Sequence, residues 1–541
     1  MLKRVARRLR DTWRGETDAT LFDFRDLRAV NHLLAEHAPG FIWDGTSTDP
    51  HRGARAARVY ELRPDLRDTF PLGLTPHPQR AGYLAWLLTY GKADYGLTPA
   101  ECLAHLATSD IFPDRGLHRT YRLQPDWQRD VPDALTPAGW PRFKRYLSDR
   151  YGLRGRWFER AGCPGRPDWA GPGLNVLAHF RYASGLQQAA VSLVSAAAEA
   201  GLDVSCRDLP VTFDCDWSDD TFTLGLEPYP VTAWVSAVNT YPSQFLPIAG
   251  LYPRPGVKRV AVWYWELDEL PADWRAHLDW PDEVWAPTRF IADAFRKTLT
   301  VPVVPMLPGV ELPDFDPLPR SHFGLPADRF LVLFSFDMGS VMARKNPLAL
   351  IAAYRQAFRA DDRAHLCIKV SRGSADPAGL AELRTACEAA GATLFDRVLP
   401  RGEALALLAS ADCYASLHRS EGFGLGLAES MLLGKPVVAT GYSGNLDFMD
   451  ATNSYLVNHT LVPIRATASA GATVANPYQS GNWADPDVGH AAELLRRVFT
   501  CRDEAAAAAA RGQATVRETL SMAAYGRRVA ERVAALGERR A

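Results

Sequence analysis

Two glutamates flank a glycine-rich turn in the stretch SEGFGLGLAES. Glu421 precedes Gly422, Gly424 and Gly426, and Glu429 stands eight residues after the first glutamate. Glycines at the start of a helix leave backbone N–H groups free to bind an anion or sugar hydroxyls, because no side chain covers them. Helical spacing keeps the two carboxylates on one side of the turn. The pattern therefore predicts a ligand site that combines carboxylate acceptors with backbone donors.

A second candidate is the basic pair Arg344 and Lys345, which leads into a predicted helix running to about Phe358. The start of a helix already carries the positive end of its dipole, so two cations there are unfavourable unless an anion completes the site. The sequence therefore favours an anion-binding role for this pair. A solvated basic pair is the alternative.

The glycine-rich turn stands in a strand, loop, helix, strand order. Residues 414–417 are β-prone and lead through a polar loop to the glycines, and an apolar helical pattern follows up to Gly434, a plausible helix stop. Residues 436–440 form the next predicted buried strand, and a second glycine loop follows at 441–444. This order is typical of an α/β fold.

Bulk composition excludes several classes of protein. The chain has 541 residues, enough for about three domains, and its net charge of -1 gives no basic field that would attract nucleic acid. The eight cysteines form no C-x-x-C pair, which favours free thiols in a reducing cytoplasm. We find no apolar run long enough to span a bilayer, and the N-terminus lacks the apolar core of a signal peptide.

Residues 1–14, MLKRVARRLRDTWR, have apolar residues at helical spacing among six basic side chains. This pattern predicts a short amphipathic helix that attaches transiently to an anionic membrane surface. A solvated helix end is the alternative.

The glycine-rich stretch resembles a known family. Glu421-Gly-Phe-Gly together with Glu429 matches the E-x7-E signature of family four glycosyltransferases, which have the GT-B fold. The YSGN sequence at 442–445 resembles a bacterial branch that acts in surface-polysaccharide assembly, some of whose members carry a helical N-terminal extension. The resemblance covers roughly residues 171–500, and an ordinary α/β core turn is the alternative.

The resemblance implies an α/β protein of GT-B type, with two Rossmann-like domains facing a cleft and a mostly helical domain in front of them. We expect the helical extension at 1–170, the acceptor-side domain at 171–315 and the donor domain at 316–500. The C-terminal helices, 501–541, are expected to cross back to the acceptor-side domain.

The resemblance also assigns roles to residues. Lys345 and Arg344 are expected to hold the donor diphosphate, Glu429 to accept hydrogen bonds from the ribose, and Glu421 to hold hydroxyls of the transferred sugar. Gly185 lies at the tip of the first-domain loop that faces the donor phosphates. The other donor-binding candidates are Gly422, Phe423, Gly424, Leu425 and Gly426 of the glycine turn. A further strand is predicted at 393–399, and Val398 and Leu399 at its end are candidates because the family places the nucleobase near this strand.

The strand end at 262–267 departs from the family pattern. Many relatives carry a histidine near this place, where this chain has Trp265 and Glu266. Glu266 is a candidate to hydrogen-bond the acceptor or the donor sugar, and a structural carboxylate is the alternative. Asp214 and Asp216 have the form of a D-x-D metal motif, but GT-B enzymes generally do not rely on one, so no metal site is predicted.

The resemblance implies a retaining hexosyltransferase that moves a sugar from a nucleoside diphosphate-sugar to a hydroxyl of a glycan or lipid-linked glycan. GDP-mannose is favoured as donor, as in mannosyltransferases, and UDP-sugars come next. No cofactor, metal ion or nucleic acid is expected, and the predicted location is the cytoplasm, with peripheral contact at the inner face of the membrane through residues 1–14. Two alternatives stay open: a nucleotide-sugar epimerase or phosphorylase with the GT-B fold, and a non-catalytic nucleotide-sugar-binding scaffold.

Overall fold

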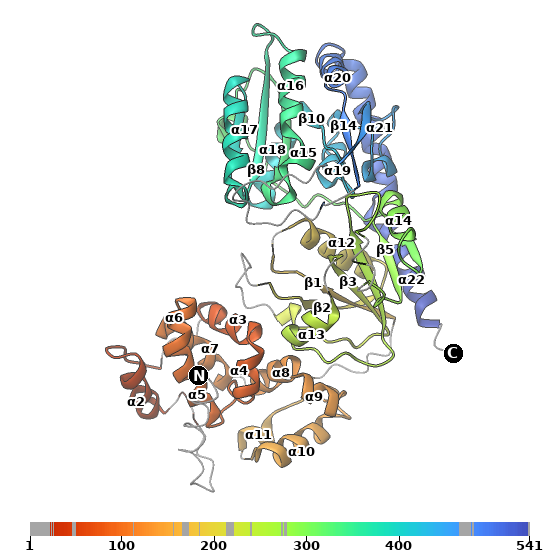
Figure 1. The fold of residues 1–541 in the computed structure, drawn as a ribbon. Helices are drawn as coiled ribbons and strands as arrows, with labels where there is room; N and C mark the ends of the chain where they lie inside the picture. Colours follow the sequence, from red (N-terminus) through yellow and green to blue (C-terminus); the bar gives the residue numbers. More distant parts are fainter. Residues whose placement is uncertain are drawn as a thin grey trace.

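The computed structural model describes residues 22, 24, 26–45, 50–111, 113–154, 156–164, 172–182, 184–211, 221–238, 241–271, 274, 278–464, 478 and 481–538. The basic segment 1–14 and the D-x-D residues Asp214 and Asp216 lie outside the described residues. Figure 1 shows three parts: a helical region at the lower left, a first half built on one sheet in the middle, and a second half built on another sheet at the top.

The first half is a six-stranded parallel sheet in the order β2-β1-β3-β4-β5-β6. Its strands are β1 (Gly173–Ala178), β2 (Asp203–Asp208), β3 (Val231–Ala237), β4 (Lys258–Tyr264), β5 (Glu283–Ala286) and β6 (Val303–Pro305). Its helices are α12 (Gly185–Glu199), α13 (Pro242–Ala249) and α14 (Arg289–Arg296). Every residue of β1 is buried, as expected of a parallel strand covered on both faces.

The second half is a six-stranded parallel sheet in the order β12-β11-β10-β7-β8-β9. Its strands are β7 (Phe330–Asp337), β8 (Ala364–Ser371), β9 (Thr393–Asp396), β10 (Cys413–Ser416), β11 (Val437–Thr440) and β12 (Tyr455–Val457). Its helices are α15 (Met342–Lys345), α16 (Pro347–Ala357), α17 (Pro377–Ala389), α18 (Arg401–Ser410) and α19 (Leu425–Leu432).

Elements after β12 connect the two halves. The antiparallel hairpin of β13 (His459–Pro463) and β14 (Asn482–Pro486) leads to α20 (Val488–Thr500) and α21 (Arg502–Thr519). The last helix, α22 (Met522–Glu538), runs down beside the first half in Figure 1. Its residues Met522, Tyr525 and Val529 share a buried cluster with residues of β1 and α12. The C-terminal helix therefore belongs to the core of the first half.

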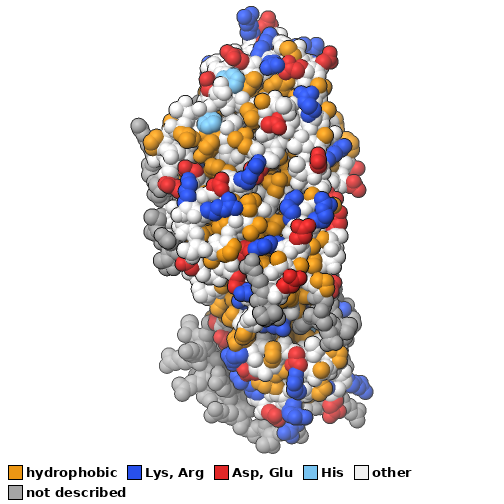
Figure 2. Space-filling view, turned by 90° about the vertical axis from the view of Figure 1, so that its right-hand side faces the viewer, with side chains coloured by type: hydrophobic (Ala, Val, Ile, Leu, Met, Phe, Trp, Pro, Cys, Tyr) orange, Lys and Arg blue, Asp and Glu red, His pale blue; other side chains and the backbone are white. Residues whose placement is uncertain are grey.

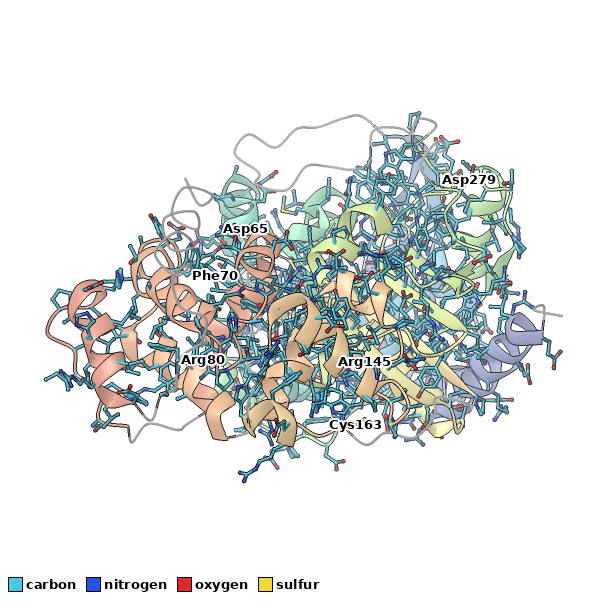
Figure 3. All side chains as sticks on the ribbon, turned by 90° about the horizontal axis from the view of Figure 1, so that it is seen from below. Asp65, Phe70, Arg80, Arg145, Cys163 and Asp279 are labelled. Atoms are coloured by element: carbon cyan, nitrogen blue, oxygen red, sulfur yellow. The ribbon has the colours of Figure 1, made fainter. Side chains whose placement is uncertain are left out.

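The helical region precedes the first sheet. Its α-helices are α2 (Leu27–His37), α3 (Ala54–Leu62), α4 (Pro64–Thr69), α5 (Gln79–Trp86), α6 (Lys92–Tyr95), α7 (Pro99–Ile111), α8 (Pro113–Leu123), α9 (Pro125–Asp130), α10 (Trp140–Tyr151) and α11 (Arg156–Arg160). Arg80 lies buried among these helices, well away from Asp279 of the first half (Figure 3). A capping box starts α7, because Glu101 accepts from the Thr98 backbone N–H at 2.8 Å.

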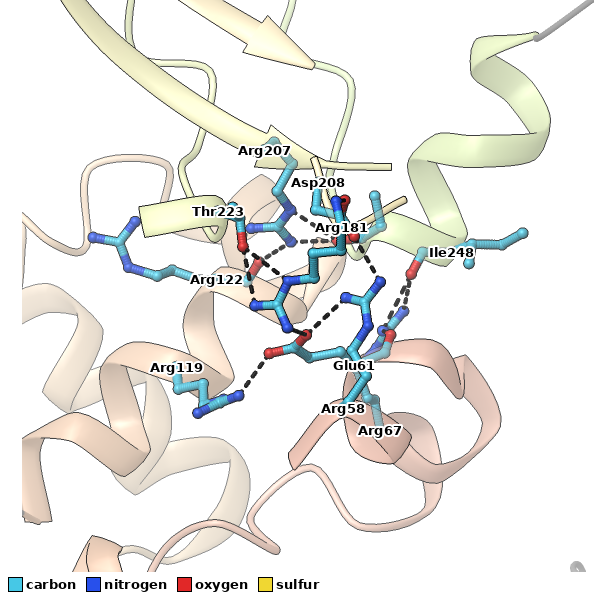
Figure 4. Close-up of polar contacts among 11 residues, drawn as sticks. Arg58, Glu61, Arg67, Arg119, Arg122, Arg181, Arg207, Asp208, Thr223 and Ile248 are labelled. Carbon is cyan, nitrogen blue, oxygen red and sulfur yellow. Dashed lines mark hydrogen bonds and ion pairs between the residues drawn. The ribbon is translucent and has the colours of Figure 1, made fainter. Parts of the chain in front are cut away.

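A buried ion network joins the helical region to the first half (Figure 4). Glu61 on α3 lies 3.0 Å from Arg58 and 2.6 Å from Arg119 of α8. Arg58 also pairs with Asp208 at the end of β2, at 2.6 Å, and Arg181 after β1 lies 3.9 Å from Glu61. Burial alone would raise the pKa of Glu61, but the arginines outweigh it and lower that pKa to about 2. Opposite buried charges in this network compensate one another, and they join the helical region to the ends of β1 and β2.

The expected fold class is confirmed: two parallel α/β sheets with helices follow a helical region. On the face in Figure 2, basic and acidic side chains are interspersed, in keeping with the net charge of -1. No helix among the described residues is long and apolar enough to cross a membrane.

Candidate active site

A cavity of ≈ 420 Å³ lies between the two halves. Glu266, which follows β4, lines it from the first half, and Arg344, Lys345 and Glu421 line it from the second. Glu266 and Glu421 both stand shortly after the carboxyl end of a parallel strand, where open α/β sheets bind ligands. Gly185 at the start of α12 also lines the cavity.

The glycine-rich turn is held in place by the second glycine loop. The Gly444 N–H donates to the Glu421 carbonyl at 2.9 Å, and the Glu421 N–H donates to the Ser443 hydroxyl at 2.9 Å. A Cβ on Gly444 would lie 1.9 Å from the Gly422 carbonyl oxygen, so only glycine fits there. Gly424 caps α19 with φ of 91°, a left-handed conformation that favours glycine. The two loops therefore form one interlocked backbone surface at the start of α19.

The first half also anchors this turn. The Thr288 hydroxyl at the start of α14 donates to the Gly422 carbonyl at 2.9 Å. The Ser420 hydroxyl donates to the Glu266 backbone carbonyl. Contacts from both halves thus hold the glycine-rich turn in position.

The basic pair lies at a helix end rather than at a helix start. Arg344 and Lys345 close the short helix α15, and Asn346, with φ of 53°, separates them from α16. A helix end favours cations, because its carbonyl groups carry negative partial charge. The sequence reasoning placed the pair correctly before α16. It missed α15, because the backbone reverses direction at Asn346 and the short helix before it shows no hydrophobic periodicity.

Glu421 is the partner of both cations. Lys345 donates to one oxygen of its carboxylate, and Nη1 of Arg344 lies 3.3 Å from the other. Burial alone would raise the pKa of Glu421, yet Lys345 and Arg344 outweigh it and lower that pKa to about 2. Nε of Arg344 is buried and has no hydrogen-bond partner among the described residues. The site therefore holds one carboxylate paired with two basic side chains, and a buried Arg344 N–H group that is available as a donor.

Glu429 lies on α19 and is 6% exposed. Its Oε1 is 2.5 Å from Nη2 of Arg401, the first residue of α18. Burial raises the pKa of Glu429, although Arg401 opposes the shift. Sequence reasoning missed Arg401, because a single arginine 28 residues before Glu429 belongs to no recognisable pattern.

Glu266 also has a partner that the sequence did not reveal. Its Oε2 accepts a hydrogen bond from the Tyr478 hydroxyl at 3.0 Å, and its Oε1 lies 3.8 Å from Nη2 of Arg344. Tyr478 stands between the two strands of the β13–β14 hairpin, 212 residues after Glu266.

The structure brings most of the predicted site residues together. Besides those above, the cavity is lined by the predicted residues Gly422, Phe423, Gly424, Leu425 and Gly426. Val398 and Leu399 do not line it: Val398 is 67% exposed and Leu399 packs against the core of the second half. The strand expected to reach residue 399 ends at Asp396, so both residues belong to the loop before α18.

Among the described residues, no group of three or more His, Cys, Asp or Glu side chains could hold a metal ion. The cavity carboxylates Glu421 and Glu429 are instead paired with Lys345 and Arg401.

Comparisons with known proteins agree with this geometry. Residues 320–463 match the family model of glycosyl transferases group 1. A D-inositol 3-phosphate glycosyltransferase from Thermomonospora curvata is 32% identical over 154 residues. That match covers 25% of this chain and 35% of the relative, so the chain spans about a third of that protein's length.

A solved glycosyltransferase structure from Rickettsia africae is similar in fold, with a TM-score of 0.50 at 13% identity. The match covers 68% of this chain and 99% of the other. The two-sheet architecture expected from the sequence is therefore that of the GT-B fold. The segment that matches the family model carries Arg344, Lys345, Glu421 and Glu429, and the comparisons support a glycosyltransferase of group 1.

Proposed function

We propose that this protein is a retaining hexosyltransferase of family four, which transfers a sugar from a nucleoside diphosphate-sugar to a hydroxyl of a glycan or lipid-linked glycan. One observation carries the proposal. A single cavity between two Rossmann-like halves gathers Arg344, Lys345, Glu421 and Glu429 around the backbone N–H groups of a glycine turn.

The proposed chemistry depends on charge at the leaving group. The bond between the anomeric carbon and the donor phosphate breaks, and its electron pair goes to the phosphate oxygen. The acceptor hydroxyl oxygen attacks the same face of the sugar, and its proton passes to the departing phosphate. Arg344, Lys345 and the N–H groups after Glu421 stabilise the negative charge that develops on the diphosphate.

The carboxylates bind hydroxyl groups in this proposal. Glu429 accepts hydrogen bonds from the ribose, and Glu421 from the transferred sugar. Each carboxylate has a cationic partner, Lys345 or Arg401, so donor binding replaces or shares contacts that already exist. Glu266 faces the same cavity from the first half and is assigned to the acceptor or the donor sugar.

GDP-mannose is the first donor to test and UDP-sugars the next. A role in bacterial surface-polysaccharide assembly at the inner face of the cell membrane, with contact through residues 1–14, completes the proposal. The resemblance of the YSGN loop at 442–445 supports that role.

A thermal-shift screen of the full chain against GDP, UDP and dTDP tests the proposal, because a ligand that binds only the folded state raises its stability by mass action. We expect one nucleoside diphosphate to raise the melting temperature. The matching donor is then given to the enzyme with a glycan acceptor in excess chelator. We expect transfer without added metal, and proton NMR showing the donor's anomeric configuration in the product. No stabilisation by any nucleoside diphosphate, or an inverted product, contradicts the proposal.

A further inference from the structure

The β13–β14 hairpin belongs to the second half in sequence but packs against the first. Trp483 of the hairpin and Tyr478 between its strands join the buried cluster around β4 and α14, and Val462 packs against it. Tyr478 is 4% exposed. The hairpin therefore places one buried tyrosine at the boundary between the halves.

Tyr478 contacts two cavity residues at once. Its hydroxyl donates to Oε2 of Glu266 at 3.0 Å, and the Arg344 guanidinium lies over its ring, 5.7 Å from the centroid. Trp265 and Trp483 hold the ring in place, with ring centroids 5.8 and 6.3 Å away. Tyr478 is not among the residues that line the cavity. It therefore contacts Glu266 and Arg344 without facing the cavity itself.

Glu266 and Arg344 do not form a close ion pair. Oε1 of Glu266 lies 3.8 Å from Nη2 of Arg344, which is beyond hydrogen-bond distance. A carboxylate with both oxygens free would form a two-bond pair with the guanidinium, and the attraction is strong in a buried site. The Tyr478 hydroxyl occupies one of those oxygens.

We propose that Tyr478 is a positioning residue for the donor diphosphate: its hydroxyl holds the Glu266 carboxylate away from Arg344 and so keeps the guanidinium available to phosphate. The inference rests on the proposed function, in which Arg344 binds the diphosphate. Without the hydroxyl, Glu266 turns to Arg344 and competes with the ligand for the same N–H donors.

The test is a double-mutant cycle on the full chain, with Kd measured by calorimetry for pyrophosphate and for the nucleoside diphosphate that the wild type binds. Tyr478→Phe keeps the ring and its packing and removes only the hydroxyl. We expect the Kd of both probes to rise about tenfold, in the range of one charge-assisted hydrogen bond. Adding Glu266→Gln to Tyr478→Phe removes the competing charge and is expected to restore both values to within about twofold. The single variant Glu266→Gln completes the cycle.

Tyr354→Phe on α16 is the matched control, because it removes a hydroxyl from a tyrosine that packs against Phe358 instead of the site. We expect it to leave both Kd values unchanged. Wild-type affinity in Tyr478→Phe, or a double variant as weak as Tyr478→Phe, overturns the inference while the proposed function stands. A wild type that binds none of the probes overturns both.

Discussion

Among single residues, Glu421 differs most from what its neighbours in sequence indicate. Its local sequence offers glycines and a polar loop, yet its carboxylate is held by Lys345 and Arg344 from a segment 76 residues earlier. The cations of the proposed diphosphate site therefore already contact a carboxylate of the protein itself. In the proposed reaction a diphosphate has to take over cations that already have a partner. Burial lowers the pKa of Lys345, and Glu421 opposes that shift.

Lys345→Ala is expected to reduce turnover more than stability. In the proposed reaction Lys345 stabilises charge on the leaving group, and losing such a contact typically lowers kcat by about a hundredfold or more. Arg344 still pairs with Glu421, so the buried carboxylate keeps one cation. Donor hydrolysis and the melting temperature measure the two effects. Lys258→Ala, at the amino end of β4 in an ion pair with Asp282, is the control. Near-normal rates in Lys345→Ala would rule out the diphosphate role.

Glu429→Ala is expected to weaken binding of the nucleoside diphosphate by about 1.5–3 kcal/mol, the usual value of hydrogen bonds to a charged group. Pyrophosphate has no ribose, so its affinity should stay the same. Calorimetry with both probes separates loss of the ribose contact from general damage to the site. Glu429→Gln should be milder, because it keeps the shape and one acceptor. Equal weakening of both probes would contradict the ribose assignment.

The sequence revealed Glu421, Glu429 and the pair Arg344 and Lys345, because each stands in a local pattern of glycines or of adjacent cations. Arg401 and Tyr478 could not be found in this way. Each meets its partner only through tertiary structure, and neither stands in a motif. Local patterns therefore identified most of the proposed ligand-binding groups and missed Arg401 and Tyr478, which contact Glu429 and Glu266.

Among the secondary-structure elements, α19 depends on the two interlocked glycine loops, because their contact determines whether its N-terminus faces the cavity. Gly444→Ala would place a methyl group within 2 Å of the Gly422 carbonyl, so the loops must separate. We expect the Kd of the nucleoside diphosphate to rise at least about tenfold. The loss of stability should be limited to about 1–3 kcal/mol, which is usual for overpacking.

Gly537→Ala on α22 is the matched control for that substitution, because an added Cβ there meets nothing within 4 Å. Calorimetry and thermal unfolding of both variants give the comparison. Unchanged nucleotide affinity in Gly444→Ala would show that the second glycine loop does not support the first.

Strands were the elements that sequence reasoning located best. β10 (Cys413–Ser416) and β11 (Val437–Thr440) begin and end within one residue of the strands predicted at 414–417 and 436–440. The short helix α15 was missed, since it begins after Val341 and ends before Asn346, both at positive φ that no sequence pattern indicates. The end of β9 was misplaced for a similar reason, because apolar residues continue into the loop at Val398 and Leu399.

At the scale of the whole molecule, the Glu61 network makes the helical region and the first half depend on each other. The pKa of Glu61 is about 2 in the folded protein, against an ordinary value of 4.5. A lowered pKa contributes stability that is fully present above about pH 5 and is lost as the pH falls towards 2. Neutral pH therefore keeps the network at full strength.

Glu61→Gln is expected to lower the free energy of unfolding at pH 7 by about 3–5 kcal/mol, because it leaves buried arginines without their counter-ion. The difference from the wild type should shrink between pH 5 and pH 2. Denaturant unfolding at several pH values measures this. Glu36→Gln, in an exposed pair with His32, is the control and should change little. A difference that does not vary with pH would mean that Glu61 contributes by packing rather than charge.

The packing of α22 on the first half also sets an order of events during synthesis. β1 and α12 leave the ribosome early, but the residues of α22 that complete their core are made roughly 300 residues later. At about 5–20 residues per second, that delay is about a quarter of a minute to a minute. The second half, whose cluster ends at Leu520, completes its own core before the first can. In a newly made chain the first half thus exposes, throughout this interval, the apolar surface that α22 covers in the folded protein.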